Sequence, residues 1–507
     1  MRGAVFEVDS VVPSQARAAW IRKPLPTCPI SDSLDCRRWQ ESLGCYYDRL
    51  PIRPPGTPVP YYYQRIIDRV RGIVEPGSRV LDIGCGTGEL LASLNPSVGV
   101  GVDFNARFVD EARKRHAHLR FVRHRAEDVA SLGDTFDYVL LSQVLGEIYD
   151  VQSLLQSIRR VCHAGTRLIV VHCNRVWQPA LRVAEWLRIK KPGPERNWIP
   201  SDELSHLLQL SGFDPVSRFG LTCMPVFVPF FSRVLNRFVG NLPGIQHLGL
   251  HYLVIGRLAG SPRPAAETPS VSIVVPARNE AGTIRSTVQR MPTLAPSQEI
   301  IFVEGGSSDD TWRAISQTVR EYRGPHRIRC MRQPGHGKAD AVRAGFAAAT
   351  GDVLMILDAD LSVKPEELPR FYDALVARQG ELINGSRMVY LMDRQAMRFL
   401  NLLANKIFGW LFTYLLGQRF RDTLCGSKVL FRRDYERIAK HRAYFGKLDP
   451  FGDFEILFGA ARLGLKIADM PVHYKARTYG QTNISRFRHG WVLLRMCLLA
   501  ARKLKFV

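Results

Sequence analysis

Apolar runs and mixed segments alternate along the first half of the chain. Four short runs rich in valine, isoleucine and leucine have the length of strands: 79–83, 98–103, 136–141 and 167–172. The segments between them, such as 106–116 and 151–161, space their apolar residues as one face of a helix does. Strands that are apolar throughout and alternate with helices are typical of a parallel sheet, so this half predicts an α/β domain.

The same alternation resumes after residue 270. It predicts strands at 271–277, 299–304, 353–360 and 381–386, and helices at 279–290 and 340–349. Two longer amphipathic segments, at about 396–416 and 487–505, predict further helices near the end of the chain. The second half is therefore expected to be another α/β domain with C-terminal amphipathic helices, whereas residues 1–50 give only weak signals.

A proline-rich stretch separates the two halves. Residues 259–270 are AGSPRPAAETPS, a composition typical of a linker. A chain of 507 residues has room for roughly two to four domains of ordinary size. The sequence thus predicts one domain over 1–258, a linker over 259–270 and a second domain over 271–507.

The chain is strongly basic, with a formal net charge of +23. Most of the excess lies from Val271 onward, and residues 471–507 contain eight lysines and arginines and no acidic side chain. Such a charge favours anionic partners, which include phosphorylated substrates, acidic lipid headgroups and nucleic acid. Because no groove-reading motif is recognisable, we do not expect a nucleic-acid partner.

Cysteine spacing and hydropathy favour a cytoplasmic protein. None of the ten cysteines forms a CxxC pair, so a zinc site is not expected. The first residues lack the apolar core of a signal peptide, and no segment reaches the ~18 apolar residues of a spanning helix. We therefore expect free thiols and a chain that contacts membranes only from their surface.

Glycines follow the first predicted strand, in the stretch VLDIGCGTGELL. Asp82, Gly84, Gly86 and Gly88 form D-x-G-x-G-x-G between a strand and a helix, where glycine lets the backbone approach a ligand closely. Asp103 ends the next strand, and a carboxylate there can accept both hydroxyls of a ribose. On these residues alone, a structural turn and a dinucleotide site remain alternatives to a nucleoside site.

The wider pattern resembles class I S-adenosylmethionine (SAM)-dependent methyltransferases over about residues 60–175. HRAEDVA resembles the segment that contacts adenine, and FDYVLLSQVLGEIYD resembles the fourth strand and its helix. The resemblance implies a Rossmann-like domain with ribose on Asp103 and the base near Asp128. The implied SAM-binding residues are Asp82, Gly84, Gly86, Gly88, Asp103, Glu127 and Asp128.

The methyl acceptor is not readable from the sequence. Residues 142–146, after the fourth strand, lack the NPPY-like tetrapeptide of amine methylases that act on nucleic acid. His163 and His172 are candidate bases, although an isolated histidine is more often structural. Residues 219–256 mix aromatics, prolines and arginines, which is compatible with core packing, an apolar acceptor pocket or a membrane contact.

Two carboxylates follow a buried strand in the stretch GDVLMILDAD. Asp358 and Asp360 are two residues apart, so both can face one ligand. Like charges this close repel unless a cation or a proton relieves them. Mg²⁺ or Mn²⁺ bound by this pair would also take oxygens from a diphosphate and offset the charge of a leaving nucleoside diphosphate. Alone, the pair is equally compatible with a structural role.

The surrounding stretches resemble inverting family 2 glycosyltransferases of the GT-A fold over about residues 271–490. They are VSIVVPARNEAGTI, IIFVEGGSSDDTW, GHGKADAVRAGFAAATGD, LDAD and NGSR, in the family's order and spacing. The implied nucleotide-sugar-binding residues are Pro276, Ala277, Arg278, Glu280, Glu304, Lys338, Asp340 and Asp358. Glu304 replaces the aspartate that usually reads the nucleobase, which leaves the identity of the base open.

The end of the chain resembles dolichyl- or polyprenyl-phosphate sugar synthases. It lacks the Q-x-x-R-W motif of processive synthases and has RDTLCGSKVLFRRD, FGDFEILFGAARLG and HYKARTYGQTNISRFRHG instead. The implied contacts to an acceptor phosphate are Ser386, Arg387, Arg477, Thr482 and Ser485. A lipid monophosphate is already a nucleophile, because its second pKa is about 6, and forked guanidinium groups suit its recognition.

Two alternatives stay open. A hydroxyl acceptor on a glycan or lipid would need a base, for which Asp453 and Glu455 are the candidates, 93 and 95 residues after Asp360. The first domain could instead be a SAM-binding scaffold that tethers the second.

We expect a bifunctional enzyme that transfers a methyl group from SAM and, with Mg²⁺ or Mn²⁺, a sugar from a nucleotide-sugar to polyprenyl phosphate. The expected catalytic residues of the second domain are Asp358, Asp360, Asp453 and Glu455. A lipid acceptor, typical of envelope glycan synthesis, requires a membrane, and basic amphipathic helices suit its anionic inner face. Helices packed on their own domain with snorkelling lysines are the alternative.

Overall fold

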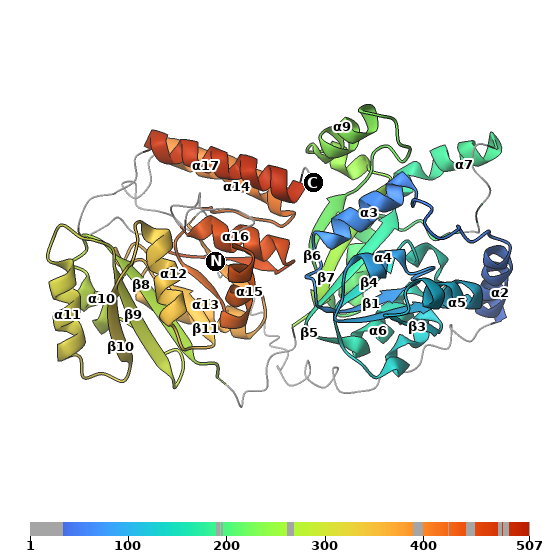
Figure 1. Ribbon diagram of the computed structural model, residues 1–507. Coiled ribbons are helices and arrows are strands. Elements are labelled where there is room, and N and C mark those ends of the chain that lie inside the picture. Colours follow the sequence, from blue (N-terminus) through green and yellow to red (C-terminus); the bar gives the residue numbers. More distant parts are fainter. Residues whose placement is uncertain are drawn as a thin grey trace, which may run out of the picture.

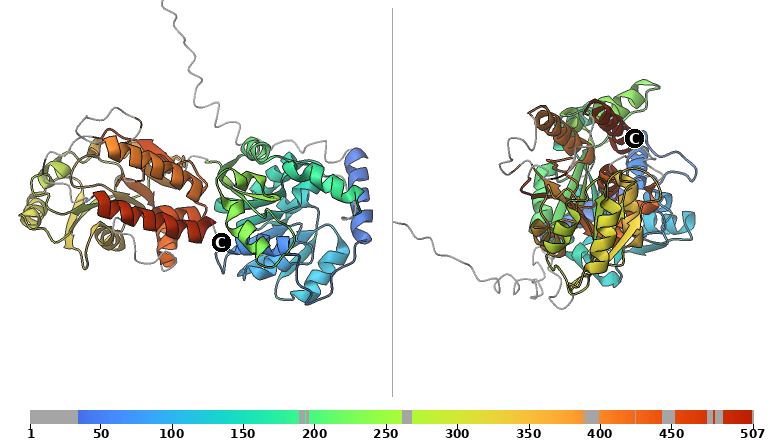
Figure 2. Two further views of the ribbon diagram at one scale, coloured as in Figure 1. Left: turned by 90° about the horizontal axis from the view of Figure 1, so that it is seen from above. Right: turned by 90° about the vertical axis from the view of Figure 1, so that its left-hand side faces the viewer.

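The computed structural model describes residues 34–188, 193, 196–260, 268–387, 389, 399–423, 425–442, 452–474, 479 and 486–505. These residues form two α/β domains that lie side by side, each built around one sheet of seven strands (Figures 1 and 2). Among them, no helix is both long enough and apolar enough to span a bilayer.

The first sheet has the strand order β3-β2-β1-β4-β5-β7-β6. Its strands are β1 (Arg79–Ile83), β2 (Val98–Asp103), β3 (Arg120–Arg123), β4 (Phe136–Ser142), β5 (Cys162–Cys173), β6 (Phe213–Gly220) and β7 (His251–Leu258). Strands β1 to β5 pair in parallel, whereas β7 runs antiparallel to both β5 and β6. The β6–β7 connection therefore emerges at the same edge as the carboxyl ends of β1, β2, β4 and β5.

Helices cover both faces of this sheet where they contribute apolar residues to the core. The helices of this domain are α2 (Leu34–Asp48), α3 (Tyr61–Arg71), α4 (Glu89–Ser93), α5 (Ala106–Arg115), α6 (Val151–Ile158), α7 (Gln178–Trp186), α8 (Ser201–Leu210) and α9 (Phe231–Arg237), of which α7 and α9 bury no apolar side chain. Helices α6 and α8 pack on one face through residues such as Leu155 and Leu208. Helices α3, α4 and α5 pack on the other through residues such as Ile66 and Val109.

The second sheet has the order β10-β9-β8-β11-β13-β12-β14. Its strands are β8 (Val271–Ala277), β9 (Gln298–Glu304), β10 (Arg327–Arg332), β11 (Val353–Ile356), β12 (Leu382–Ser386), β13 (Lys428–Phe431) and β14 (Ile467–Pro471). Strands β8 to β11 pair in parallel, and β13 runs antiparallel between β11 and β12. Both sheets are thus mixed, which differs from the all-parallel pattern expected for the first half.

The helices of the second domain include two long ones close to the end of the chain. All are α10 (Ile284–Gln289), α11 (Thr311–Glu321), α12 (Lys338–Ala348), α13 (Leu368–Val376), α14 (Phe399–Leu416), α15 (Arg432–Lys440), α16 (Asp453–Arg462) and α17 (Arg486–Ala500). A short π-helical turn, Ala501–Lys505, continues α17. The amphipathic helices expected near the C-terminus are therefore present in the described part of the chain.

Two predicted elements are shorter in the structure than the sequence suggested. The strand expected over 353–360 ends at Ile356, so the two acids of LDAD lie in the loop beyond it. The helix expected over 279–290 begins only at Ile284, because residues 281–283 form a turn. In both places the chain leaves regular structure close to a candidate ligand site.

Buried ion pairs join the two domains. Arg167 Nη2 at the start of β5 lies 2.7 Å from Glu381 Oε1, and Arg257 Nη1 at the end of β7 lies 3.8 Å from Glu381 Oε2. Lys466 of the second domain pairs with Asp214 of the first at 2.5 Å. The proposed linker lies between β7 and β8, and residues 261–267 of it are outside the described residues.

Candidate active sites

The glycine loop after β1 has the conformation that its sequence requires. Gly84, Gly86 and Gly88 have φ values of +74°, +54° and +86°, which side chains other than hydrogen disfavour. A Cβ on Gly84 would lie 2.8 Å from Val144, and one on Gly88 would lie 2.7 Å from Phe121. A Cβ on Gly86 would meet nothing within 4 Å, so the open space beside the loop lies next to Gly86.

Two buried carboxylates flank this loop. Asp103 Oδ2 accepts a hydrogen bond from the Gly86 backbone N–H at 2.9 Å, and Oδ1 accepts one from the Asn105 N–H at 2.9 Å. Asp82 is 1% exposed, and its Oδ1 has no hydrogen-bond partner within the described structure. Burial, with smaller contributions from Asp103 and Glu89, raises the pKa of Asp82 to about 8.

These features fit SAM. The open cradle at Gly86 accepts a ligand, and the unsatisfied Asp82 oxygen requires a donor or a cation, which the ammonium group of the methionine moiety can supply. Glu127 and Asp128 lie on a 3₁₀ segment, Ala126–Leu132, and Arg125 lies 3.8 and 4.0 Å from their carboxylates. The base contact predicted for this segment remains a prediction.

A second group of residues at this edge was not predicted from the sequence. Tyr47 of α2 donates a hydrogen bond to Glu147, and Arg196 Nη2 lies 3.4 Å from the same carboxylate. Trp39 Nε1 of α2 donates to the Glu147 carbonyl at 2.9 Å. Burial raises the pKa of Glu147. Because Tyr47 and Trp39 lie 100 and 108 positions before Glu147 and Arg196 lies well after it, only the fold brings these residues together.

The two histidines that were candidate bases have different surroundings. His172 is buried, which lowers its pKa to about 4, and it lines a small cavity with Gln143 and Arg196 near the loop edge. A neutral imidazole there is compatible with a base. His163 lies at the other end of β5, where Nε2 is 3.1 Å from exposed Asp137, so it is remote from the glycine loop.

In the second domain, the acids of LDAD face a lysine. Lys338 Nζ, at the start of α12, lies 2.5 Å from Asp358 Oδ1. Asp360 is buried, and its Oδ1 accepts a hydrogen bond from the Ser362 N–H at 3.0 Å. The Gly426 backbone lies against this pair, because a Cβ at this position would collide with both Asp358 and Lys338.

Several acids determine the electrostatics around Lys338. Burial disfavours its charge, but Asp358, Asp453 and Asp360 together hold the pKa of Lys338 above its ordinary value. The fold therefore brings three of the predicted catalytic acids around one cation. Among the described residues no group of three or more His, Cys, Asp or Glu side chains could hold a metal ion. A metal on Asp358 and Asp360 would need further oxygens, which a diphosphate can supply, as Mg²⁺ sites often require.

The residues predicted to contact the nucleotide-sugar lie along one edge of the second sheet. Pro276 and Ala277 end β8, and Arg278 beyond them is exposed. Glu280 is buried, and its backbone N–H donates to Thr311 Oγ1 at 2.8 Å. Glu304 ends β9, and its Oε1 accepts from the Ser307 N–H at 2.5 Å. Asp340 lies in the first turn of α12, two residues after Lys338.

The two candidate bases are paired with cations. Asp453 Oδ1, at the start of α16, is 2.9 Å from Lys428 Nζ, which is completely buried and also donates to the Cys425 carbonyl. Glu455 Oε2 is 2.5 Å from Arg343 Nη2, and Glu455 Oε1 is 2.5 Å from Arg442 Nε. Both carboxylates are thus engaged in ion pairs with neighbouring side chains.

The predicted acceptor-phosphate contacts are described only in part. Ser386 is buried, and its Oγ has no hydrogen-bond partner in the described structure. The Arg387 guanidinium forms a bidentate pair with buried Asp422, with N–O distances of 2.7 and 2.8 Å. A role in binding the acceptor would require this pair to open. The remaining contacts, which lie outside the described residues, are Arg477, Thr482 and Ser485.

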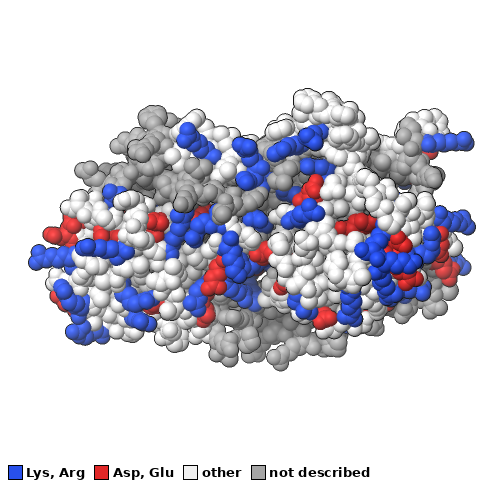
Figure 3. Space-filling model, in the orientation of Figure 1, with Lys and Arg blue, Asp and Glu red and all other residues white. Residues whose placement is uncertain are grey.

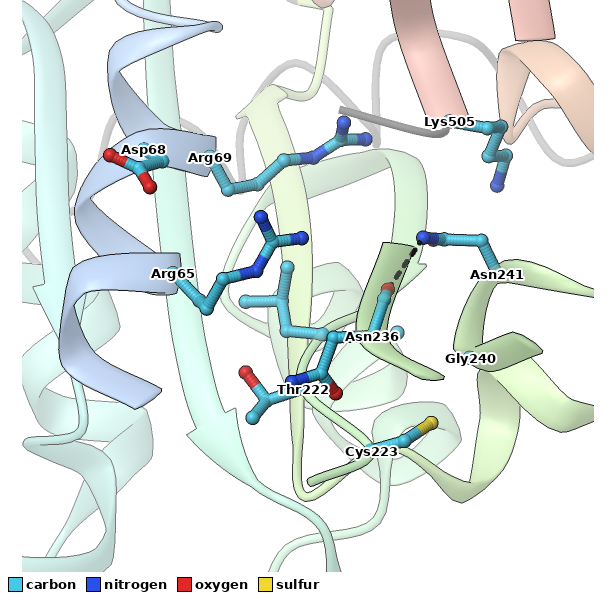
Figure 4. A pocket seen from close by; sticks show the side chains of 11 residues that line it. Arg65, Asp68, Arg69, Thr222, Cys223, Asn236, Gly240, Asn241 and Lys505 are labelled. Atoms are coloured by element: carbon cyan, nitrogen blue, oxygen red, sulfur yellow. Dashed lines mark hydrogen bonds between the residues drawn. The ribbon is translucent and has the colours of Figure 1, made fainter. Parts of the chain in front are cut away.

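A further cavity lies at the seam between the domains. It is bordered by α3 and α9 of the first domain and by the end of α17, and Figure 4 shows Arg65, Arg69 and Lys505 directed towards it. Lys505 Nζ donates to Gln246 at 3.1 Å. Burial, with a contribution from Arg69, lowers the pKa of Lys505 to about 7. The cavity is separate from the glycine loop and from the acid pair.

Comparison with known proteins agrees with the two sites. Residues 57–218 match the family model described as a methyltransferase domain. Residues 272–438 match the model of glycosyl transferase family 2. The chain joins a methyltransferase domain to a family 2 glycosyltransferase domain. The predicted fold class and the predicted pair of enzyme classes are thereby confirmed.

The curated relatives include sugar transferases. Glycosyltransferase AglD of Haloferax volcanii is 29% identical over 242 residues, which are 45% of this chain and 36% of the relative. An undecaprenyl-phosphate 4-deoxy-4-formamido-L-arabinose transferase of Salmonella choleraesuis is 31% identical over 236 residues, 44% of this chain and 65% of the relative. The chain thus spans less than two thirds of either relative. A solved SAM-dependent methyltransferase of Thermotoga maritima aligns at 18% identity and a TM-score of 0.31, over 44% of this chain and 94% of its own.

Proposed function

We propose that the second domain transfers a sugar, with inversion, from a nucleotide-sugar to a polyprenyl phosphate. The observation that carries this proposal is the pairing of both candidate bases, Asp453 and Glu455, with buried or forked cations. A hydroxyl acceptor must lose a proton and needs a base, whereas a phosphate oxygen is already ionised. The undecaprenyl-phosphate transferases among the relatives support the same acceptor class.

The residues around the acid pair suit a leaving nucleoside diphosphate. Asp358 and Asp360 would hold Mg²⁺ or Mn²⁺, which neutralises charge on the diphosphate when bound. Lys338, held charged by its acidic neighbours, can exchange Asp358 for a phosphate oxygen of the donor. The acceptor phosphate attacks the anomeric carbon on the face opposite the diphosphate, and the bond from that carbon to the diphosphate oxygen breaks. No proton is removed in this step.

Sugar transfer can be tested with radiolabelled UDP- and GDP-sugars, Mg²⁺ or Mn²⁺, and a short polyprenyl phosphate. We expect label in the organic phase, lost with Asp360→Ala and with a chelator, in a product that mild acid hydrolyses as a glycosyl phosphate. The matched acceptor is the polyprenyl alcohol, which should receive no label. Transfer to the alcohol but not to the phosphate would favour the hydroxyl reaction and a reinterpretation of Asp453.

We propose that the first domain transfers a methyl group from SAM, which supplies an electrophilic methyl on its sulfonium sulfur. Asp82 would bind the ammonium group, Asp103 the ribose, and the loop Gly84–Gly88 would lie along the ligand. Titration of SAM into the full chain tests this, with Gly86→Val as the control that fills the open space. Absence of SAM binding by a folded wild-type chain would favour a scaffold role.

The membrane is the natural partner of a lipid acceptor. Helices α14 and α17 expose Ile407, Trp410, Trp491, Leu494 and Leu498 to solvent, and the π-helical turn after α17 carries Arg502 and Lys503 besides buried Lys505. Such helices bind the interface of an anionic leaflet. We propose a cytoplasmic chain bound peripherally to the inner face of a membrane through these two helices.

A further inference from the structure

The methyltransferase domain has an apolar surface of its own, which meets the second domain at Asn241, whose carbonyl accepts a hydrogen bond from Tyr414. It consists of residues 176–187, including α7, and residues 226–242, including α9; we call it the apolar rim. Trp186 and Phe230 are 81% and 84% exposed. Other large apolar side chains of the rim that are exposed are Val176, Val183, Leu187, Val226, Phe227, Val228, Phe231, Phe238 and Leu242. Single exposed apolar residues are ordinary, but a patch of this extent marks an interaction surface.

The topology places the apolar rim beside the SAM loop. Residues 174–187 follow the carboxyl end of β5, and residues 221–250 connect β6 to β7 at that same edge, where Cys173 pairs with His251. The glycine loop and Asp103 lie at the carboxyl ends of β1 and β2, also on this edge. In open α/β sheets ligands bind outside this edge. The rim therefore borders the entrance that a methyl acceptor would use.

Hydrogen bonds hold the segments that carry the rim. Asn174 Nδ2, just before the first half, donates to the carbonyls of His247 and Gly249, which lie beyond the second half, at 2.7 and 3.0 Å, and Trp177 Nε1 of the first half donates to the Leu248 carbonyl at 2.7 Å. In the second half, Asn236 bonds both the N–H and the carbonyl of Met224, which precedes that half, at 2.8 Å. The exposed aromatics are thus carried by a surface with a defined backbone, not by a detached loop.

The charge around these aromatics suits an anionic bilayer. Residues 219–250 contain two arginines, Arg233 and Arg237, and no acidic residue, and residues 174–191 contain five basic side chains against Glu185. In Figures 1 and 2, α7 and α9 lie along the same side of the molecule as α14 and α17, and Figure 3 shows more Lys and Arg than Asp and Glu along that border. Aromatics interspersed with arginines are typical of the headgroup region.

We propose that the apolar rim docks the methyltransferase site on an anionic membrane surface, so that its methyl acceptor is a membrane-borne, lipid-linked molecule. The inference rests on the proposed methyl transfer. We assign the rim to lipid and not to a second copy of the chain, because its net charge is positive, so that two copies repel each other whereas anionic headgroups attract it. One face of the molecule would then serve both active sites.

Hydrogen exchange of the full chain tests the docking. We expect anionic vesicles, of phosphatidylglycerol in phosphatidylcholine, to protect residues 178–187 and 226–238, together with α14 and α17. The control is α8, whose exposed Leu210 lies towards the opposite edge of the sheet and should show no change. Protection of α14 and α17 without the rim would overturn the inference while the membrane proposal survives. Protection of the rim that rises with protein concentration alone would assign it to self-association and overturn the inference too.

A matched pair of variants gives a second readout. Trp186→Ser with Phe230→Ser should weaken vesicle binding at least tenfold and leave SAM affinity unchanged, because both side chains are exposed and lie outside the SAM loop. Leu210→Ser, which also removes an exposed apolar side chain, should bind vesicles as the wild type does. Equal vesicle binding by the rim variant and the wild type would contradict the docking.

The acceptor class is tested with methyl-labelled SAM and a cell lysate separated into membranes and soluble fraction. We expect label in lipid extracted from the membranes, dependent on Gly86 as judged with Gly86→Val, and reduced by the rim variant. Label only in the soluble fraction, or in neither fraction, would overturn the acceptor assignment. Failure of SAM binding itself would instead reject the proposed methyl transfer.

Discussion

At the scale of single residues, the first site depends on a buried carboxylate that lacks a partner. Asp82 Oδ1 has no hydrogen bond within the described structure, and burial raises the pKa of Asp82 to about 8. In the free protein this carboxyl is therefore protonated below about pH 8. A bound ammonium group favours the ionised form, so SAM binding must release a proton below that pH.

We accordingly expect SAM affinity to rise with pH and to level off above about pH 8, with a slope of at most about tenfold per pH unit. Calorimetric titration at several pH values, in buffers of different ionisation enthalpy, measures both the affinity and the released proton. Asp82→Asn should bind SAM more weakly at high pH and should lose the pH dependence. A wild-type affinity that is flat from about pH 6 to 9 would contradict this role.

Gly426 offers a second residue-scale test, in the other domain. A Cβ there would collide with Asp358 and Lys338, so Gly426→Ala must displace both side chains. We expect sugar transfer to fall by about two orders of magnitude, as misplaced catalytic groups do, with SAM binding unchanged. Gly44→Ala is the matched control, because a Cβ at Gly44 meets nothing within 4 Å. Unchanged turnover in Gly426→Ala would argue that the acid pair is remote from the reaction.

Site residues could be predicted from the sequence where they lie close to one another along the chain. Asp82 and Gly86 share one strand–loop–helix unit, and Asp358 and Asp360 share one loop, so local pattern sufficed. Glu147 and Tyr47 meet only through the packing of α2 on the sheet edge, which no local pattern encodes. The Asp422 partner of Arg387 was missed for the same reason.

At the scale of elements, α16 tests which acceptor reacts. Asp453 at its first turn pairs with completely buried Lys428, so Asp453→Asn leaves an uncompensated buried charge. We expect this variant to lose about 3 kcal/mol of the free energy of unfolding, as broken buried pairs do. Denaturant unfolding and sugar transfer to polyprenyl phosphate are measured in parallel.

The double variant Asp453→Leu with Lys428→Met separates structure from chemistry. Removing both charges should recover part of the lost stability, because a buried pair replaced by apolar residues is often tolerated. If the acceptor is a phosphate, the stable double variant should keep transfer within about tenfold of the wild type, since no base is removed. A stable but inactive double variant would assign Asp453 as a base.

Helices α14 and α17 make a prediction about membrane binding. Trp410→Ser with Trp491→Ser removes two exposed indoles, and we expect flotation with anionic vesicles to fall at least tenfold. Raising the salt concentration should weaken the remaining binding, because screening reduces attraction between basic residues and the lipid surface. Vesicle binding equal to that of the wild type would remove these helices from the membrane contact.

Hydrophobic pattern predicted the central elements well, because strands buried on both faces have a strong signal. The strands 79–83, 98–103 and 271–277 occur with the predicted bounds. Edge strands such as Arg120–Arg123 and Arg327–Arg332 were missed, since arginines occupy half of their positions. The antiparallel strands β7 and β13 were also not predicted, because strand direction depends on which neighbouring strand the chain returns to.

At the scale of the whole molecule, the seam around Glu381 joins the domains. Arg167 and Arg257 approach its carboxylate from the first domain. Burial opposes ionisation, but these two arginines hold the pKa of Glu381 below its ordinary value. The ionised group therefore stabilises the assembly above the unfolded pKa, and this stability is lost as the pH falls through the lower folded pKa.

We expect Glu381→Gln to lower the free energy of unfolding by about 3 kcal/mol at neutral pH, because buried Arg167 loses its carboxylate partner and Arg257, among the described residues, keeps only the Asp214 carboxylate. The difference from the wild type should vanish in acid. The control Glu366→Gln breaks an exposed pair with Arg290 and should cost less than about 1 kcal/mol. Calorimetric scans of both variants measure these differences. Equal melting temperatures of Glu381→Gln and the wild type would show that the seam adds no stability.

The sequence predicted two domains and the linker between them but not how they pack. Arg167 and Arg257 lie at the ends of apolar runs, where arginine usually marks the return to solvent. Both are buried, because the neighbouring domain supplies Glu381. A contact between residues more than two hundred positions apart has no signature in either local stretch.

The most direct test uses both labelled donors in one incubation with the full chain. The donors are methyl-labelled SAM and a sugar-labelled nucleotide-sugar, and polyprenyl phosphate and membranes are present as acceptors. Wild type, Asp82→Asn, Asp360→Ala and the variant that combines Asp82→Asn with Asp360→Ala are compared. We predict that both labels enter the lipid fraction with wild type, that Asp82→Asn removes only the methyl label and that Asp360→Ala removes the sugar label. Sugar label that persists in Asp360→Ala, or that never enters lipid with the wild type, would contradict the account.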